Sequence, residues 1–154
     1  MDRAAVGVHL TRTSERVDEV REFVAAHGGA VGISGVLADL NRRAHAVHVP
    51  ARAATWGFRW NEQDGNSRRW WPQGITSSAD IGPGSDCVDG RAVLCTSWYS
   101  KDVDGLNKGS RVTFVDITSA RSIGYRHVLL VEPVVRDDGR IDVRPVKVHA
   151  GGIV

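Results

Sequence analysis

The stretch Trp70-Trp71-Pro72-Gln73-Gly74-Ile75-Thr76 sets the expected organisation of this chain. Its Gly-Ile pair recurs at the C-terminal end, in His149-Ala150-Gly151-Gly152-Ile153-Val154. The segments between these two points are rich in β-branched and aromatic residues, which favour strands. The paired stretches therefore predict a repeat whose two copies open at Gly74 and Gly152.

The composition is that of one ordinary globular domain, with 154 residues, 42% of them hydrophobic and 25% charged. The 20 Lys and Arg residues are interspersed with 18 Asp and Glu, so no strong positive field for nucleic acid arises. The first ten residues lack the apolar segment of a signal peptide, and no apolar run approaches the roughly 18 residues of a membrane span. We therefore expect neither a nucleic-acid nor a membrane partner, and a cytoplasmic location by default.

The two cysteines lie in different settings. Cys87 is in a loop rich in Gly, Pro and Asp, and Cys95 is in an apolar, strand-like run. A disulfide forms only if the loop folds back over the strand; two reduced thiols are the favoured alternative.

The N-terminal third is expected to contain the best helix, over residues 15–27. Val17, Val20, Phe23 and Val24 recur on one helical face, Thr13 or Ser14 is the expected N-cap, and Gly28-Gly29 ends the helix. A short strand at 30–33, a short helix capped by Ser34 that extends as far as Ala44, and a strand at 46–49 are predicted to follow.

From Trp70 onward the pattern predicts strands at 73–78, 91–99, 111–117, 125–135 and 141–148, with loops at 80–90 and 100–110. Residues 128–131 are apolar at every position, which predicts a strand covered on both faces. We expect residues 1–55 to form an N-terminal helical segment and residues 56–154 a β-rich region, in one continuous domain. The predicted fold is mainly β, an antiparallel propeller-blade-like sheet with an N-terminal α-helix.

Three segments in this order carry a family resemblance, namely Pro72-Gln73-Gly74-Ile75, residues 111–118 (RVTFVDIT) and His149-Ala150-Gly151-Gly152-Ile153. They resemble bacterial β-propeller proteins of the LVIVD-like kind, whose blades open with a Gly-Ile inner strand. The resemblance implies more blades than this chain supplies. The chain is therefore expected to be either a fragment of a propeller or a smaller β-rich unit with the same strand order, open to self-association through an unpaired sheet edge.

Four residues are candidates for ligand binding, and the resemblance selects two of them. Inner strands line the channel of a propeller, so it implies that Gln73 and His149 point toward a ligand, while the alternative is that they satisfy backbone groups. Trp71, in Arg68-Arg69-Trp70-Trp71, either stacks on a ligand or packs in a core seam, and the seam is favoured. Asp80 is the fourth candidate, although aspartates at turns more often cap backbone amides.

The sequence gives little indication of a metal site or of a catalytic nucleophile. His45 and His48 fall on opposite faces of a strand, His127 in an apolar strand is expected to be a core histidine, and Asp64-Gly65-Asn66 reads as a turn. No nucleophile motif is present in the sequence. We therefore expect a non-enzymatic binding or scaffold domain for a small molecule or protein, with no cofactor. The alternative is a metal-assisted lactonase or lyase that uses His149, Gln73 and Asp80 around a divalent metal.

Overall fold

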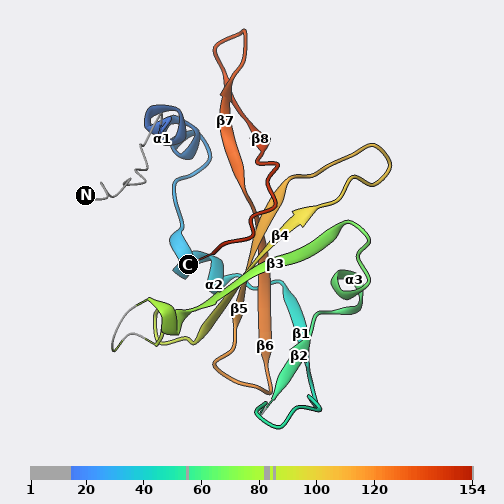
Figure 1. The fold of residues 1–154 in the computed structure, drawn as a ribbon. Helices are drawn as coiled ribbons and strands as arrows, with labels where there is room; N and C mark the ends of the chain where they lie inside the picture. Colours follow the sequence, from blue (N-terminus) through green and yellow to red (C-terminus); the bar gives the residue numbers. More distant parts are fainter. Residues whose placement is uncertain (1–14, 55, 82–83, 85, 154) are drawn as a thin grey trace, which may run out of the picture.

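A computed structural model describes residues 15–54, 56–81, 84 and 86–153, and its main feature is a six-stranded antiparallel sheet (Figure 1). The strand order is β2-β1-β6-β5-β4-β3, and the sheet curls into a half-barrel. Its strands are β1 (Arg42–Val47), β2 (Gly57–Arg59), β3 (Trp70–Ser77), β4 (Val93–Ser100), β5 (Ser110–Asp116) and β6 (Ile123–Leu129). A second, two-stranded sheet pairs β7 (Val131–Val135) with β8 (Ile141–Pro145). The prediction of a mainly β, antiparallel fold with an N-terminal helix is confirmed.

Strands β3 to β6 form a meander, since each pairs antiparallel with the next in sequence. Strands β1 and β2 extend the same sheet beyond β6, so a segment from the N-terminal third supplies an interior strand. The predicted loop at 80–90 and the turn at 137–139 both separate strands, and Gly139 adopts the positive φ of 79° that the turn requires.

The N-terminal helix α1 (Val17–Ala26) is confirmed and ends as predicted, with Gly28 and Gly29 at positive φ. The expected caps Thr13 and Ser14 lie outside the described residues; Arg16 occupies the N-cap position and makes no side-chain cap. The Arg16 side chain instead donates to the Pro133 carbonyl at 2.6 Å, which ties α1 to the β7–β8 hairpin.

The segment between α1 and β2 differs from the prediction. Helix α2 (Gly32–Ala38) starts where a strand was expected at 30–33, and Ser34 lies inside the helix rather than at its cap. Strand β1 starts at Arg42, so Ala44 lies on a strand and pairs with Ile123. Pairing with β6 and β2 on both sides overrides the weak local preference of this segment.

The single long strand predicted at 125–135 is wrong. The chain leaves the main sheet at Leu130, whose amide donates to the Ser110 carbonyl at 2.9 Å, and β7 then pairs with β8. Leu129 and Val131 are 52% and 42% exposed, so this apolar run is not covered on both faces. At this run the chain passes from the six-stranded sheet to the two-stranded sheet.

Helix α3 packs on one face of the main sheet and helix α2 on the other, and we call these the α3 face and the α2 face. Directly paired residues share a face, so the α3 face carries Trp98, Arg111, Thr113, Tyr125 and His127. The α2 face carries their neighbours along the strands, including Ser97, Tyr99 and Phe114. The apolar core of Val115, Ile123 and Tyr125 lies on the α3 face.

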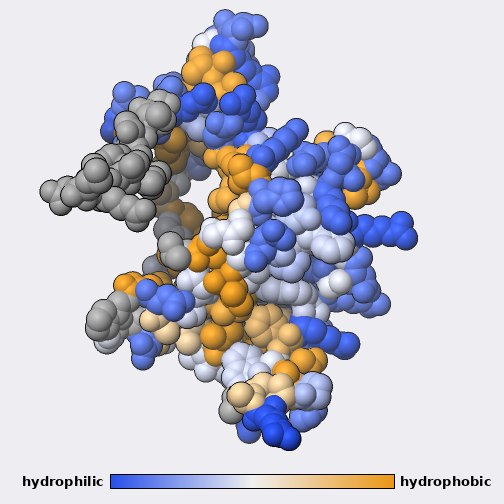
Figure 2. All heavy atoms as spheres, viewed as in Figure 1, coloured by the Kyte–Doolittle hydropathy of each residue, from blue (hydrophilic) through white to orange (hydrophobic). Residues whose placement is uncertain are grey.

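The C-terminal segment lies across the α2 face. Ser110 donates to the Val148 carbonyl at 2.5 Å, and Ser97 donates to the Ala150 carbonyl at 2.6 Å. Ser97 also accepts from the Gly74 amide at 2.9 Å, so one hydroxyl joins the two Gly-Ile stretches of the sequence. Figure 2 shows apolar surface gathered in a band down the middle of the view, where β3 and the C-terminal segment lie close together in Figure 1.

Candidate functional site

Asp64 is the centre of a buried polar group on the α3 face. It belongs to α3 (Glu62–Gly65), a single helical turn that begins where the Asn61 side chain accepts from the Asp64 amide at 2.9 Å. The turn holds the Asp64 carboxylate against the sheet, where the residue is only 6% exposed. There the Tyr125 hydroxyl donates to Oδ2 at 2.6 Å.

Two arginines flank this carboxylate. Arg42 Nη1 lies 3.1 Å from Asp64 Oδ2, and Arg111 Nη2 lies 3.7 Å from Oδ1. The Arg111 guanidinium also lies against two tryptophans, with Cζ 4.3 Å from the ring centroid of Trp70 and 4.8 Å from that of Trp98. Such contacts with aromatic faces stabilise a desolvated cation.

His127 completes the group, which we call the Arg111 cluster: Asp64, Arg42, Arg111, Tyr125 and His127. Its Nδ1 is 2.6 Å from the Thr113 hydroxyl. Its Nε2 is 3.1 Å from Asp64 Oδ2 but lacks the alignment of a hydrogen bond.

Burial controls the ionisation of the cluster. Desolvation lowers the pKa of His127 to about 4, with the charge of Arg111 acting in the same direction against the pull of Asp64. Desolvation also lowers the pKa of Arg111 to about 10. Burial raises the pKa of Asp64, but the hydrogen bond from Tyr125, the nearby His127 ring and the charge of Arg42 outweigh it and give a net lowering. At neutral pH the cluster therefore holds two cations and one anion.

Several buried nitrogens of this region have no hydrogen-bond partner among the described residues. They are Trp98 Nε1, Arg111 Nε, Arg111 Nη2 and His127 Nε2. A buried donor without an acceptor costs about 1–3 kcal/mol. The donors of Arg111 are the most notable, because this residue is only 5% exposed. The arrangement suits a group that brings acceptor oxygens.

Two neighbours of the cluster lie at the surface. Trp60 packs edge-on against Trp98 and Tyr125, with ring centroids 5.0 Å apart in each pair. The same Trp60 lines a pocket of about 600 Å³ beside α3. At the other end, Leu129, the cross-strand partner of Arg111, is 52% exposed.

The sequence-predicted residues Trp71 and His149 lie together on the α2 face. Trp71 pairs across the strands with Tyr99, and the His149 ring stacks on Tyr99 at 4.3 Å between centroids. Lys101 Nζ lies 3.6 Å from the Trp71 ring centroid. Tyr99, Lys101 and His149 line a pocket of about 340 Å³. Trp71 is 45% exposed, whereas its neighbour Trp70 packs on Arg111 in the seam that was favoured for this pair.

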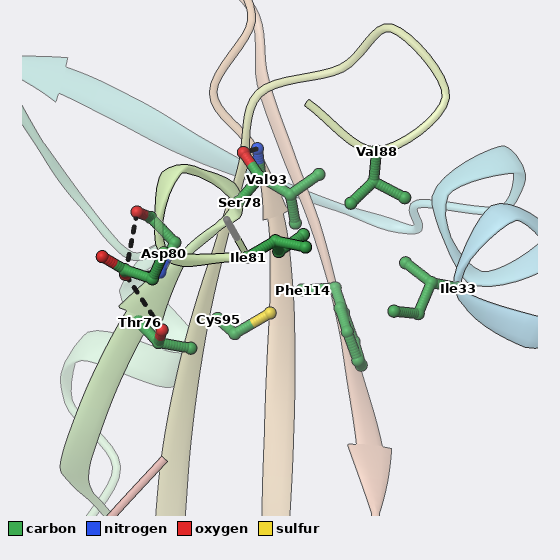
Figure 3. A pocket seen from close by; sticks show the side chains of 10 residues that line it. Ile33, Thr76, Ser78, Asp80, Ile81, Val88, Val93, Cys95 and Phe114 are labelled. Carbon is green, nitrogen blue, oxygen red and sulfur yellow. Dashed lines mark hydrogen bonds between the residues drawn. The ribbon is translucent and has the colours of Figure 1, made fainter. Parts of the chain in front are cut away.

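Gln73 and Asp80 are placed elsewhere. The exposed Gln73 side chain donates to the Pro72 carbonyl at 3.0 Å. Asp80 ends the turn η1 (Ser78–Asp80), where its Oδ2 accepts from the hydroxyls of Thr76 and Ser77 and from the Ser77 amide (Figure 3). This is the capping role expected of an aspartate at a turn.

Cys87 and Cys95 are both free thiols. Within the described ranges, no group of three or more His, Cys, Asp or Glu side chains is arranged to hold a metal ion. The helices that are described are all too short or too polar to cross a membrane.

Comparison with known proteins finds no matching family model, no matching curated protein and no matching solved structure.

The sequence reasoning missed Asp64, Arg111 and Tyr125. The sequence around Asp64 indicates a turn, and only the fold shows that this turn covers a sheet face. A signal was present in the alternation of β5, where Arg111 shares a face with Thr113 and Val115. A charged residue on the apolar side of a strand predicts a buried partner.

Proposed function

We propose that this chain is a binding domain that takes a small anionic molecule at the Arg111 cluster. The observation that carries the proposal is the buried Arg111 guanidinium, whose Nε and Nη2 find no acceptor among the described residues. Arginine presents a rigid fork of donors that matches a carboxylate or phosphate. An anion at this position supplies the missing acceptors.

The charges of the cluster support the same class of ligand. Arg42 and Arg111 face the single carboxylate of Asp64, and His127 is neutral at pH 7 because its pKa is about 4. The sum is one positive charge in a largely desolvated site. A ligand with one negative charge neutralises it, whereas a cation adds repulsion.

The aromatic side chains define the body of the ligand. Trp70 and Trp98 cover the guanidinium, and Trp60 stands between the cluster and the pocket beside α3. Apolar walls with a few placed polar groups are typical of small-molecule sites. We therefore propose a planar or apolar body that bears a carboxylate.

The relationship to LVIVD-like propellers stays a proposal. The β3–β6 meander supports it, whereas residues 149–153 lie in no strand, so the second Gly-Ile stretch is not an inner strand. Three further hypotheses also stay predictions: a metal-assisted lactonase or lyase, a scaffold role, and self-association through a sheet edge. The binding proposal does not depend on any of them, because it is built on the side chains of the cluster.

The test is a titration with benzoate, at constant ionic strength, followed by the indole N–H signals of Trp70 and Trp98 in ¹H–¹⁵N spectra. We expect saturable shifts with benzoate and none with the neutral analogue benzamide. Arg111→Met abolishes the shifts, whereas Arg144→Met, which removes an exposed arginine paired with Glu132 on the hairpin, leaves them unchanged. Absence of saturation, or equal affinity in Arg111→Met, would overturn the proposal.

A further inference from the structure

A second pocket lies on the α2 face, away from the Arg111 cluster. It is formed between α2, the loop after η1 and strands β3, β4 and β5, and its volume is about 180 Å³ (Figure 3). Ile33, Val88, Val93, Cys95 and Phe114 supply apolar walls around it. We infer that this pocket binds a small, uncharged apolar molecule of about single-ring size.

The volume sets the size of the ligand. A cavity of about 150 Å³ lined by aliphatic and aromatic side chains is large enough to hold benzene. A pocket of about 180 Å³ fits one ring with one or two substituents, and it is too small for a fused polycyclic body.

The polar groups of the lining set the charge of the ligand. Among the described residues of the lining, Asp80 is the one ionised side chain, and its Oδ2 already accepts three hydrogen bonds from Thr76 and Ser77. Burial raises the pKa of the Cys95 thiol, so this group stays protonated and acts as a small apolar surface. No described residue of this lining compensates a charged ligand.

The rim of the pocket explains how a ligand enters. Val93 is 2% exposed, whereas Ile33 and Ile81 are 44% and 62% exposed. The pocket therefore runs from a buried wall to an apolar opening between α2 and η1. A small apolar molecule seated there removes part of this exposed apolar surface from water.

Cys95 provides the test. In a Cys87→Ser background it is the only thiol of the chain, and its alkylation by N-ethylmaleimide is followed by intact mass spectrometry. We expect toluene and p-cresol to slow the reaction saturably, by about tenfold at ten times their Kd. Acetamide, which is small but polar, leaves the rate unchanged. Lack of saturable protection by either ring compound up to its solubility limit would overturn the inference.

A filling variant checks that protection arises in the pocket. Val88→Phe places a ring inside and is expected to remove the protection by toluene. Ile75→Phe, at a 66% exposed position that pairs with Thr96 on the α3 face, retains it. If Val88→Phe does not fold, amide shifts on toluene titration of the unmodified chain decide. Shifts confined to Ile33, Cys95 and Phe114 support the inference, and diffuse or absent shifts refute it.

Discussion

The two faces of the six-stranded sheet differ in whether their buried polar groups have hydrogen-bond partners. On the α2 face, Ser97 accepts from the Gly74 amide and donates to the Ala150 carbonyl, so the hydroxyl is satisfied by the chain itself. On the α3 face, Arg111 is buried with two nitrogens that no described residue satisfies. Buried polar groups that are hydrogen-bonded within the chain stabilise the fold. Buried polar groups without a hydrogen-bond partner cost stability, and they indicate a binding site for a ligand.

The largest effect is expected from Asp64→Asn. This change leaves Arg42 and Arg111 without their counter-charge, and breaking a buried pair in this way costs about 3–5 kcal/mol. Urea unfolding at pH 7 measures the free energy of unfolding.

The matched control lies on the α2 side of β5. Asp116 pairs with Arg91 at 3.2 Å, but the Arg91 side chain is 40% exposed. Asp116→Asn is expected to cost about 1 kcal/mol or less. Equal losses from Asp64→Asn and Asp116→Asn would remove the distinction between the faces.

The next effect is a dependence of stability on pH that comes from His127. Its folded pKa of about 4 lies below the ordinary value of 6.5, so the unfolded chain binds more protons between these values. The free energy of unfolding therefore falls as the pH is lowered from 6.5 toward 4. At pH 4.5 the resulting loss of unfolding free energy is about 2–3 kcal/mol.

His127→Gln is expected to reduce that pH dependence, because it removes the titrating ring beside Asp64 and Arg111. His48→Gln, at an exposed position before β2, serves as the control and leaves the slope unchanged. Urea unfolding at pH 7 and pH 4.5 measures both slopes. An unaltered slope in His127→Gln would show that other groups cause the acid sensitivity.

A smaller loss is expected on the α2 face from Gly74→Ala. A Cβ at Gly74 would lie 2.9 Å from Ile153 Cγ2, 2.9 Å from Ser97 Oγ and 3.0 Å from the Gly151 carbonyl, so the C-terminal segment must move. We expect a cost of about 1–2 kcal/mol and faster hydrogen exchange at residues 149–153.

Gly151→Ala is the matched control for the same segment. No described residue would lie within 4 Å of its Cβ, so exchange and stability are expected to stay close to those of the unmodified chain. Exchange that is equally slow in Gly74→Ala would show that the two Gly-Ile stretches do not depend on close contact.

The sequence predicted those parts of the fold that local pattern controls. The α1 helix has one apolar face and two glycines after it, and β4 and β5 are rich in strand-forming residues. The break at Leu130 was not predictable, because the apolar run continues across it and only the pairing partner changes: the Leu130 amide still bonds to Ser110 of β5, whereas its carbonyl accepts from Val146 beside β8. The same holds for β1, whose pairing with β6 joins segments far apart in the sequence.

The candidate site was less accessible to sequence reasoning. Trp71 and His149 do share a surface, because the C-terminal segment lies across Tyr99. The Arg111 cluster joins five residues from α3, β1, β5 and β6, and no short motif contains three strands and a covering turn. Its chemistry appears only when Asp64 is brought against the sheet.

The most direct measurement is the stability of Arg111→Met without any added anion. Asp64 keeps its bonds to Tyr125 and Arg42 in this variant, so no buried charge is left unpaired, and the unsatisfied donors are removed. If Arg111 serves a ligand rather than the fold, urea unfolding gives a free energy within about 1 kcal/mol of the unmodified chain. A loss of about 3 kcal/mol or more would contradict this, because it would make Arg111 a structural partner of Asp64.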